Sequence, residues 1–475
     1  MKIHFIGICG KLNAGLAIEL KNLGHEVTGS DKAFYPPMST LLEKNNLPIL
    51  VGYKEEHLDE NNLPDLVTYG AAIGEDNIEV IKAKKLNIET CSPTELLEKF
   101  VIKKNSIVIT GNYGKTTITG LLVKIFTDLG LNPSYMIGGE VPELESVKIT
   151  SSDWSIIEGD EYPAEKNGKS KFFYYHPKYL IVTSVKWDHT DIFKTEEDYK
   201  VNFLNLMQSV PEGGIIIVNA EDELFLKNSK FSKLQEDQSI KSEIIYSNLS
   251  NYLETHTNSL IFLDKPINPK IFGKHNLENI SLALELLKQC FDNDFLKANI
   301  DSIINSINTY PGPTRRLQIK FDNVIKSQTS LDNHLVIIDD FAHNPEKFKA
   351  SISAVADKFK DHKITCIILP NLGNITKVSL SQYQGVFDNV VIDEVIIPRW
   401  STKIAEDSET YASENYFAQF LNLNKVKVEK EDDKFIECLL SKIETISENH
   451  VVLFMGSEPF RGMIDILIKK LNNAN

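Results

Sequence analysis

The sequence contains few cysteines and no pair of them in C-x-x-C spacing. The cysteines are scattered along the 475 residues, at Cys9, Cys91, Cys290, Cys366 and Cys438. An odd and dispersed set excludes both a disulfide framework and a cysteine zinc site. It indicates reduced, mostly buried thiols, as in a cytoplasmic protein.

Positive charge is also scarce, and long apolar runs are absent. The 66 Asp and Glu residues outnumber the 51 Lys and Arg residues, so the formal net charge is −15. We expect no nucleic-acid partner, because phosphate neutralisation needs a basic face. Anionic substrates remain compatible, since a few placed cations and helix ends bind them locally. We expect no membrane partner, because no apolar stretch approaches the ~20 residues of a membrane span. The opening MKIHFIGICG is too short for a signal peptide and is typical of a first strand.

What the sequence does contain is an α/β pattern, too long for one core. Short apolar strands alternate with helical stretches, which predicts parallel, doubly wound sheets. A polar stretch at 98–105 separates the first alternating unit from the second, and Tyr310-Pro311-Gly312-Pro313 ends the second. We therefore expect three α/β domains in series, over residues 1–103, 104–312 and 313–475.

The run ITGNYGKTT at 109–117 carries the clearest chemical signal. An apolar strand, 106–110, leads into a glycine loop, and a helix over about 116–129 follows. Such a unit presents backbone N–H groups and a positive helix end to an anion. Lys115 suits β/γ-phosphates and the Thr116 hydroxyl suits Mg²⁺. The glycine spacing is shorter than in G-x-x-x-x-G-K-[ST]. The alternative is a simple glycine turn.

An acidic turn, IIEGDEY at 156–162, follows the next strand candidate. An acid at a strand end beside a phosphate loop can hold Mg²⁺ directly or through water. Glu158 stands at that end, whereas Asp160 and Glu161 suit a supporting or substrate-side role. Read alone, such a turn is more often simply solvated.

Two further segments offer polar groups after the acidic turn. KWDHTDIF at 186–193 contains His189, which could bind a second Mg²⁺, orient a carboxylate, or form a structural pair with Asp188. GKHNLEN at 273–279 opens a helix, and its Asn side chains complement the adenine N6/N7 edge. Helix capping by Asn276 is the alternative.

The last third of the chain begins with two arginines and continues with an acidic strand end. GPTRRLQ at 312–318 suits phosphate contacts that form when domains close, or a salt bridge across the junction. IIDDFAHNP at 337–345 places Asp339, Asp340 and His343 at the carboxyl end of a strand, where ligands bind in open sheets. Asp340 could accept from ribose hydroxyls. The Asn-Pro at the end of this run could equally be only a helix start.

The first strand is followed by GICGKLNAG at 7–15, and Ser30-Asp31 ends the second strand. This resembles the start of a dinucleotide-binding fold, but Cys9 and Lys11 interrupt the glycine spacing expected for NAD. The pattern fits a diphosphate-bearing ligand generally.

Taken in order, these motifs resemble the Mur ligase family, which forms peptide bonds on UDP-linked muramic acid precursors of peptidoglycan. The resemblance implies a Rossmann-like N-terminal domain that binds UDP. It implies a central P-loop ATPase domain with a mostly parallel sheet, and a Rossmann-like C-terminal domain that binds the incoming amino compound. It also implies ATP and Mg²⁺ as cofactors, and phosphorylation of the lactyl carboxylate of UDP-N-acetylmuramate to an acyl phosphate that the amine attacks.

The resemblance further implies roles for single residues. The catalytic positions are Lys115, Glu158 and His189. The metal positions are Thr116, Glu158 and His189. The ATP positions are Gly111, Asn112, Gly114, Lys115, Thr116, Thr117, Asn276, Asn279, Arg316 and Asp340. The UDP-sugar positions are Gly7, Gly10, Ser30, Asp31 and Ser39.

Within the family, the segments YPPMS at 35–39 and FGKHN at 272–276 favour a particular reaction. It joins UDP-N-acetylmuramate to the murein tripeptide L-Ala-γ-D-Glu-meso-diaminopimelate in peptidoglycan recycling, by a monomer or weak homodimer. Addition of L-alanine is the alternative within the class. Ser184 and Lys186 depart from the family pattern before the Asp-His pair, so a nucleotide-binding relative with decayed catalysis is a further alternative. An oxidoreductase is disfavoured, because hydride transfer requires no triphosphate site.

Overall fold

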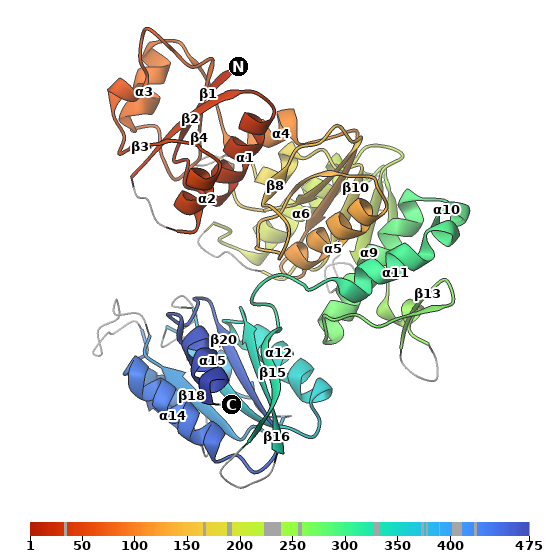
Figure 1. The fold of residues 1–475 in the computed structure, drawn as a ribbon. Coiled ribbons are helices and arrows are strands. Elements are labelled where there is room, and N and C mark those ends of the chain that lie inside the picture. The colour runs from red at the N-terminus through yellow and green to blue at the C-terminus, as the bar shows by residue number, and fades with distance from the viewer. Residues whose placement is uncertain are drawn as a thin grey trace. The chain divides into compact units, whose positions relative to one another are not determined.

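The computed structural model describes most of the chain as two compact units (Figure 1). The residues described are 1–32, 36–164, 168–187, 192–222, 239–254, 259–326, 332–371, 375–376, 379–388, 390–400, 411–421 and 425–474. One unit comprises Met1–Lys270 with Asn276–Gly312, and the other comprises Ile271–His275 with Pro313–Asn475.

The N-terminal sheet is fully parallel, with strand order β3-β2-β1-β4-β5. Its strands are β1 (Lys2–Ile6), β2 (Glu26–Asp31), β3 (Ile49–Val51), β4 (Leu66–Tyr69) and β5 (Glu89–Cys91). Its helices are α1 (Lys11–Asn22), α2 (Met38–Lys44), η1 (Glu55–His57), α3 (Ile78–Lys85) and α4 (Pro93–Phe100). The strand order reverses beside β1, so the glycine loop after β1 lies where open sheets bind ligands.

Local sequence explains where these helices begin. In α4, the Ser92 hydroxyl oxygen accepts a hydrogen bond from the Glu95 N–H, the Glu95 carboxylate accepts one from the Ser92 N–H, and Pro93 occupies the first turn. This capping box satisfies backbone N–H groups that would otherwise have no partner.

The central sheet has strand order β12-β11-β10-β6-β9-β7-β8 and is parallel except for its β7–β8 edge. Its strands are β6 (Asn105–Thr110), β7 (Ser134–Met136), β8 (Val147–Lys148), β9 (Trp154–Glu158), β10 (Tyr179–Val182), β11 (Ile215–Asn219) and β12 (Glu243–Ser247). The helices are α5 (Lys115–Asp128), η2 (Lys171–Tyr174), α6 (Glu196–Ser209), η3 (Leu249–Tyr252), α9 (Lys274–Cys290), α10 (Asn293–Ala298) and α11 (Ile300–Thr309). A short antiparallel hairpin consists of β13 (Leu260–Phe262) and β14 (Lys265–Ile267).

The C-terminal sheet has strand order β15-β16-β20-β17-β18-β19 and is parallel except for the β15–β16 pair. Its strands are β15 (Gln318–Lys326), β16 (Asp332–Asp340), β17 (Lys363–Leu369), β18 (Glu394–Pro398), β19 (Val426–Glu429) and β20 (His450–Gly456). The helices are α12 (Pro345–Lys358), η5 (Ser379–Tyr383), α13 (Glu414–Phe420), α14 (Asp432–Glu444) and α15 (Met463–Ala474). The three sheets confirm the predicted α/β fold class with three domains in series.

The N-terminal and central sheets share one buried apolar cluster, to which Phe5, Leu16, Val147 and Phe203 contribute. Helix α1 packs against β8 of the central sheet. The two sheets therefore form one compact unit despite the polar stretch between them. The boundaries proposed from sequence stay predictions.

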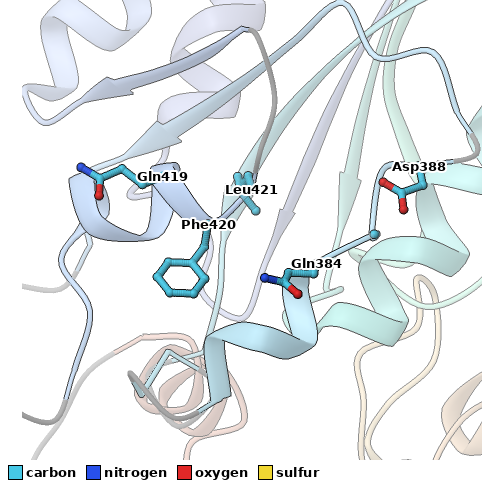
Figure 2. A pocket seen from close by; sticks show the side chains of 6 residues that line it. Gln384, Asp388, Gln419, Phe420 and Leu421 are labelled. Carbon is cyan, nitrogen blue, oxygen red and sulfur yellow. The ribbon is translucent and has the colours of Figure 1, made fainter.

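A shallow groove of about 570 Å³ lies on the C-terminal unit (Figure 2). The lining residues are Gln384, Gly385, Asp388, Gln419, Phe420 and Leu421. No cation is among them, so this groove does not suit nucleotide phosphates. None of the helices in the described ranges is both long and apolar enough to cross a bilayer.

Candidate functional site

The glycine loop between β6 and α5 has the backbone that a phosphate loop requires. Gly111 has φ +122° and Gly114 has φ +77°, a region that glycine adopts without strain. A Cβ on Gly111 would lie 2.7 Å from the Ser184 carbonyl oxygen. Gly114 is the N-cap of α5, so the positive end of this 14-residue helix faces the loop. Thr117, one of the predicted ATP residues, is buried in the first turn of α5.

Lys115 is anchored over this loop. Its Nζ donates to the Gly111 carbonyl oxygen at 2.6 Å and pairs with Glu161 Oε2 at 3.2 Å. Glu161 is buried, and Tyr199 donates its hydroxyl to Glu161 Oε1 at 3.4 Å. The lysine is thus held at the loop by an acid that bound phosphate would replace as its partner.

Thr116 and Glu158 meet at the ends of α5 and β9. The Thr116 hydroxyl donates to Glu158 Oε1 at 2.9 Å, and the Gly138 N–H donates to Glu158 Oε2 at 2.8 Å. Gly139 lies so close that a Cβ there would be 2.9 Å from Thr116 Oγ1. This contact between a hydroxyl and a carboxylate brings the loop and the acidic turn together, and their shared role in Mg²⁺ binding stays a prediction.

The other acid of the turn, Asp160, faces elsewhere. Its Oδ2 pairs with Lys171 Nζ at 2.7 Å, and its Oδ1 accepts from the Tyr162 N–H at 3.1 Å. These contacts hold the turn itself.

Helix α9 brings the two predicted adenine residues to the loop. The Asn279 side chain lies against Gly114, where its Cγ would be 2.9 Å from an added Cβ. Asn279 Nδ2 donates to Asn276 Oδ1 at 3.4 Å, and both side chains are buried. Because α9 begins at Lys274, Asn276 lies within the first turn and is not the helix cap.

The segment before the Asp188-His189 pair also contacts the loop. The Asn112 N–H donates to the Ser184 carbonyl oxygen at 3.1 Å, and Asn112 Oδ1 accepts from the Lys186 N–H at 2.6 Å. Asp188 and His189 lie outside the described residues. The role predicted for His189 stays a prediction.

The glycine loop of the N-terminal sheet is held by the end of β2. The Gly7 N–H donates to the Ser30 carbonyl oxygen at 2.8 Å, and the Gly10 N–H donates to the Gly7 carbonyl oxygen at 3.2 Å. Asp31 Oδ2 accepts from the Cys9 N–H at 2.8 Å. The carboxylate predicted to bind a UDP-sugar therefore shapes the loop.

Two predicted UDP-sugar residues have buried side chains. The Ser30 hydroxyl donates to Glu79 Oε2 at 2.5 Å, and Glu79 Oε1 is 2.6 Å from His57 Nδ1. Burial raises the pKa of Glu79, but its hydrogen bonds outweigh burial and lower it overall. Ser39 in α2 is also buried. Sugar-nucleotide binding by this set stays a prediction.

In the C-terminal unit, Asp340 ends β16 and is buried. Its Oδ1 accepts from the Leu317 N–H at 3.1 Å, and its Oδ2 accepts from the Ser351 hydroxyl. His275 lies near Asp340 and Arg316, and burial lowers the pKa of its imidazole. The partners of this acidic strand end thus lie within the C-terminal unit. The ribose contact of Asp340 stays a prediction.

The two neighbouring arginines have different surroundings. Arg315 Nε pairs with Asp339 Oδ1 at 3.3 Å, and Arg315 Nη2 donates to the Gly456 carbonyl oxygen at 2.7 Å. The Arg316 guanidinium lies 4.9 Å from the centre of the Phe341 ring, a cation–π distance. Arg315 therefore forms a salt bridge, but within the C-terminal unit and not across the junction as the alternative expected. The phosphate contact of Arg316 stays a prediction.

The structure adds residues that the motifs did not indicate. Gly138 and Gly139 follow β7 and contact the Thr116–Glu158 pair. Lys11 donates from α1 to the Gly138 carbonyl oxygen at 2.8 Å. The Gly-Gly pair after a strand was the available sequence signal.

The oxygens of Thr116 and Glu158 fit Mg²⁺, which prefers hard oxygen ligands and keeps phosphate and water oxygens as its remaining ligands. In the described ranges, no three His, Cys, Asp or Glu side chains gather into a metal cluster.

Comparison with known proteins agrees with this arrangement. Family models match in chain order: "Mur ligase family, catalytic domain" at 2–105, "Mur ligase middle domain" at 109–287 and "Mur ligase, glutamate ligase domain" at 316–458.

Two curated relatives and one solved structure illustrate the likeness. UDP-N-acetylmuramate–L-alanyl-γ-D-glutamyl-meso-2,6-diaminoheptandioate ligase of Escherichia coli K12 is 30% identical, over 80% of this chain and 81% of its own. UDP-N-acetylmuramate–L-alanine ligase of a Sulfurihydrogenibium species is 28% identical, over 99% and 98%. The crystal structure of UDP-N-acetylmuramate-alanine ligase from Thermotoga maritima has a TM-score of 0.69 at 21% identity, covering both chains fully. The chain belongs to the Mur ligase family and is an ATP-dependent ligase that forms amide bonds.

Proposed function

We propose that this ligase joins the lactyl carboxylate of UDP-N-acetylmuramate to the amine of L-Ala-γ-D-Glu-meso-diaminopimelate. The observation that carries the proposal is the contact between the central glycine loop and the acidic turn. Lys115 and the Thr116–Glu158 pair would form one phosphate site beside the N-terminal glycine loop. The acceptor's carboxylate would become an acyl phosphate, which the tripeptide amine attacks.

Each of the chain's own groups has a positioning or charge-stabilising role in this scheme. Lys115 would exchange Glu161 for phosphate oxygens, and the α5 N-terminus would add its positive end. Thr116 and Glu158 would hold Mg²⁺, which supplies charge neutralisation on the phosphates. Asn276 and Asn279 would contact adenine, and Arg316 and Asp340 the phosphate and ribose. No covalent intermediate on the protein is needed.

The choice of tripeptide is supported by two sequence features. The E. coli relative that carries the tripeptide in its name is 30% identical to this chain. The segments at 35–39 and 272–276 favour the same substrate. Addition of L-alanine is the second candidate, because ligases named for L-alanine match at 28–30% identity. We further propose that the enzyme works in the cytoplasm, where ATP and UDP-sugars are available.

Phosphate release tests this assignment. Protein, Mg²⁺, ATP and UDP-N-acetylmuramate would be mixed separately with the tripeptide and with L-alanine. We expect release with the tripeptide and little with L-alanine, and none for Lys115→Met with either. The reverse preference would establish the L-alanine reaction. No release with either amine, from protein with an intact melting transition, would reject UDP-N-acetylmuramate ligation.

A further inference from the structure

Lys11 connects the two glycine loops of the first unit. It is the first residue of α1, directly after the loop that follows β1. Its Nζ donates to the carbonyl oxygen of Gly138 at 2.8 Å. Gly138 lies just after β7 of the central sheet. A side chain from the N-terminal sheet thus reaches the edge of the phosphate site.

The contact lies one peptide away from the groups that surround the phosphates. The N–H of Gly138 donates to Glu158 Oε2 at 2.8 Å, and Glu158 Oε1 accepts from Thr116 at 2.9 Å. The Lys11 ammonium therefore stands beside the end of the site where a phosphoryl group would be transferred.

The ammonium has an incomplete set of partners. It is half-buried, and no carboxylate in the described ranges lies within 4.0 Å of its Nζ. Its one hydrogen bond is to a neutral amide oxygen, although an ammonium carries three donors. Burial lowers the pKa of Lys11, and the more distant carboxylates of Glu158 and Glu140 only partly oppose this. A cation taken out of water in this way calls for an anion.

The position identifies which anion fits. Lys115 and the α5 N-terminus are the groups proposed above to bind the phosphates of the nucleotide. Lys11 arises instead from the loop expected to hold the sugar nucleotide. The group that must lie between the two loops is the carboxylate that accepts the phosphoryl group.

We propose that Lys11 is a substrate-binding residue that donates to the acceptor carboxylate of the sugar nucleotide during its phosphorylation. One carboxylate oxygen forms the new bond to the γ-phosphorus while the bond from that phosphorus to ADP breaks. Lys11 donates to the other oxygen, and no proton is transferred. The assignment rests on the proposed function, because it requires an acceptor that carries a carboxylate.

Two ligands that differ only in this group provide the test. UDP-N-acetylmuramate carries the lactyl carboxylate, and UDP-N-acetylglucosamine lacks the lactyl group. Calorimetric titration, without ATP or amine, would measure both against wild type and Lys11→Met. We expect about tenfold to a hundredfold weaker binding of UDP-N-acetylmuramate, the size of a charge-assisted hydrogen bond. Binding of UDP-N-acetylglucosamine should stay within about twofold. Lys11→Arg should restore most of the loss.

Lys148→Met is the matched control. Lys148 pairs with Glu19 of α1 at 3.3 Å and so also connects α1 with the central sheet, but its ammonium is bonded to Glu19 and not to Gly138. If Lys11 merely held the sheets together, both methionine variants would weaken both ligands. We expect Lys148→Met to bind both ligands as wild type does, with melting curves showing that every variant folds.

The outcomes separate this assignment from the proposed function. Wild type that binds neither sugar nucleotide would reject the proposed acceptor, and the role of Lys11 with it. Wild type that binds UDP-N-acetylmuramate, with Lys11→Met equally tight, would reject Lys11 alone. Equal weakening of both ligands by Lys11→Met would also reject the carboxylate contact, because the lysine would then act on the shared UDP portion.

Discussion

The carboxyl end of the central sheet and that of the C-terminal sheet carry similar polar motifs, but they use them differently. At the central end, Lys115 and Glu158 contact groups that phosphate or Mg²⁺ would replace or share. At the C-terminal end, the Asp340 carboxylate is enclosed by the Leu317 N–H and the Ser351 hydroxyl. A carboxylate at a strand end can thus either be available to a ligand, as proposed for Glu158, or hold the neighbouring loop, as Asp340 does. Its neighbours decide which.

The largest effect that this comparison predicts is on catalysis at the central end. Lys115→Met should lower ATP-dependent phosphate release by about 10²–10³-fold, because it removes a charge aimed at the phosphates. The melting temperature should also fall, because the variant removes the lysine that pairs with the buried Glu161 carboxylate. Lys124→Met is the control on the same helix, where an exposed pair with Asp128 is removed. Comparable loss of activity in both variants would break the comparison.

The C-terminal sheet contains a buried histidine, and we expect its protonation to make this sheet less stable in acid. Burial lowers the pKa of His450, at the start of β20, to about 4, and the Thr365 hydroxyl lies 2.8 Å from its Nε2. The unfolded chain takes up this proton near pH 6.5, whereas the folded chain does so only near pH 4. Stability is therefore full above about pH 6.5 and falls as the pH drops towards 4, by about 3 kcal/mol in all.

The measurement is the free energy of unfolding of the C-terminal sheet at pH 7 and at pH 4.5, for wild type and His450→Gln. The variant should lose much of the pH dependence. His176→Gln changes an exposed histidine in the other unit and serves as control. An unchanged pH dependence in His450→Gln would contradict the prediction.

The smallest effect expected is that of Asp340→Asn. An amide offers one oxygen to two donors, so one of them loses its acceptor, at a cost of about 1–3 kcal/mol of stability. Denaturant unfolding would measure this against Asp433→Asn, an exposed acid on α14. Unchanged stability in Asp340→Asn would show that these two hydrogen bonds do not hold the loop and would break the comparison. A raised KM for ATP would instead support the proposed ribose contact.

Much of the fold was predictable because buried parallel strands leave a strong apolar signal. The strand expected at 106–110 is observed at Asn105–Thr110, and the helix expected over about 116–129 is observed at Lys115–Asp128. The antiparallel strand β15 was missed, because a register shift between Ile319 and Phe321 breaks its alternation. Helix α14 was also missed, since it lies in a charged stretch.

Site residues that are adjacent in the sequence could be predicted, whereas those brought together only by tertiary packing could not. Gly114, Lys115 and Thr116 are adjacent in the chain, so their common role is visible in the sequence. Lys11 and Gly138 are 127 positions apart. Only the packing of α1 on the central sheet brings them together, and no local pattern encodes it.

The sequence by itself determined the α/β class, the order of the domains and the shortened phosphate loop, since strand period, punctuation and glycine conformation are local properties. The tertiary structure decided which polar groups meet. It paired Thr116 with Glu158, assigned an ion pair to Arg315, enclosed Asp340, and brought Lys11 to the carbonyl oxygen of Gly138. Those outcomes depend on contacts between distant segments, where burial and the supply of hydrogen-bond partners fix the role of each charge.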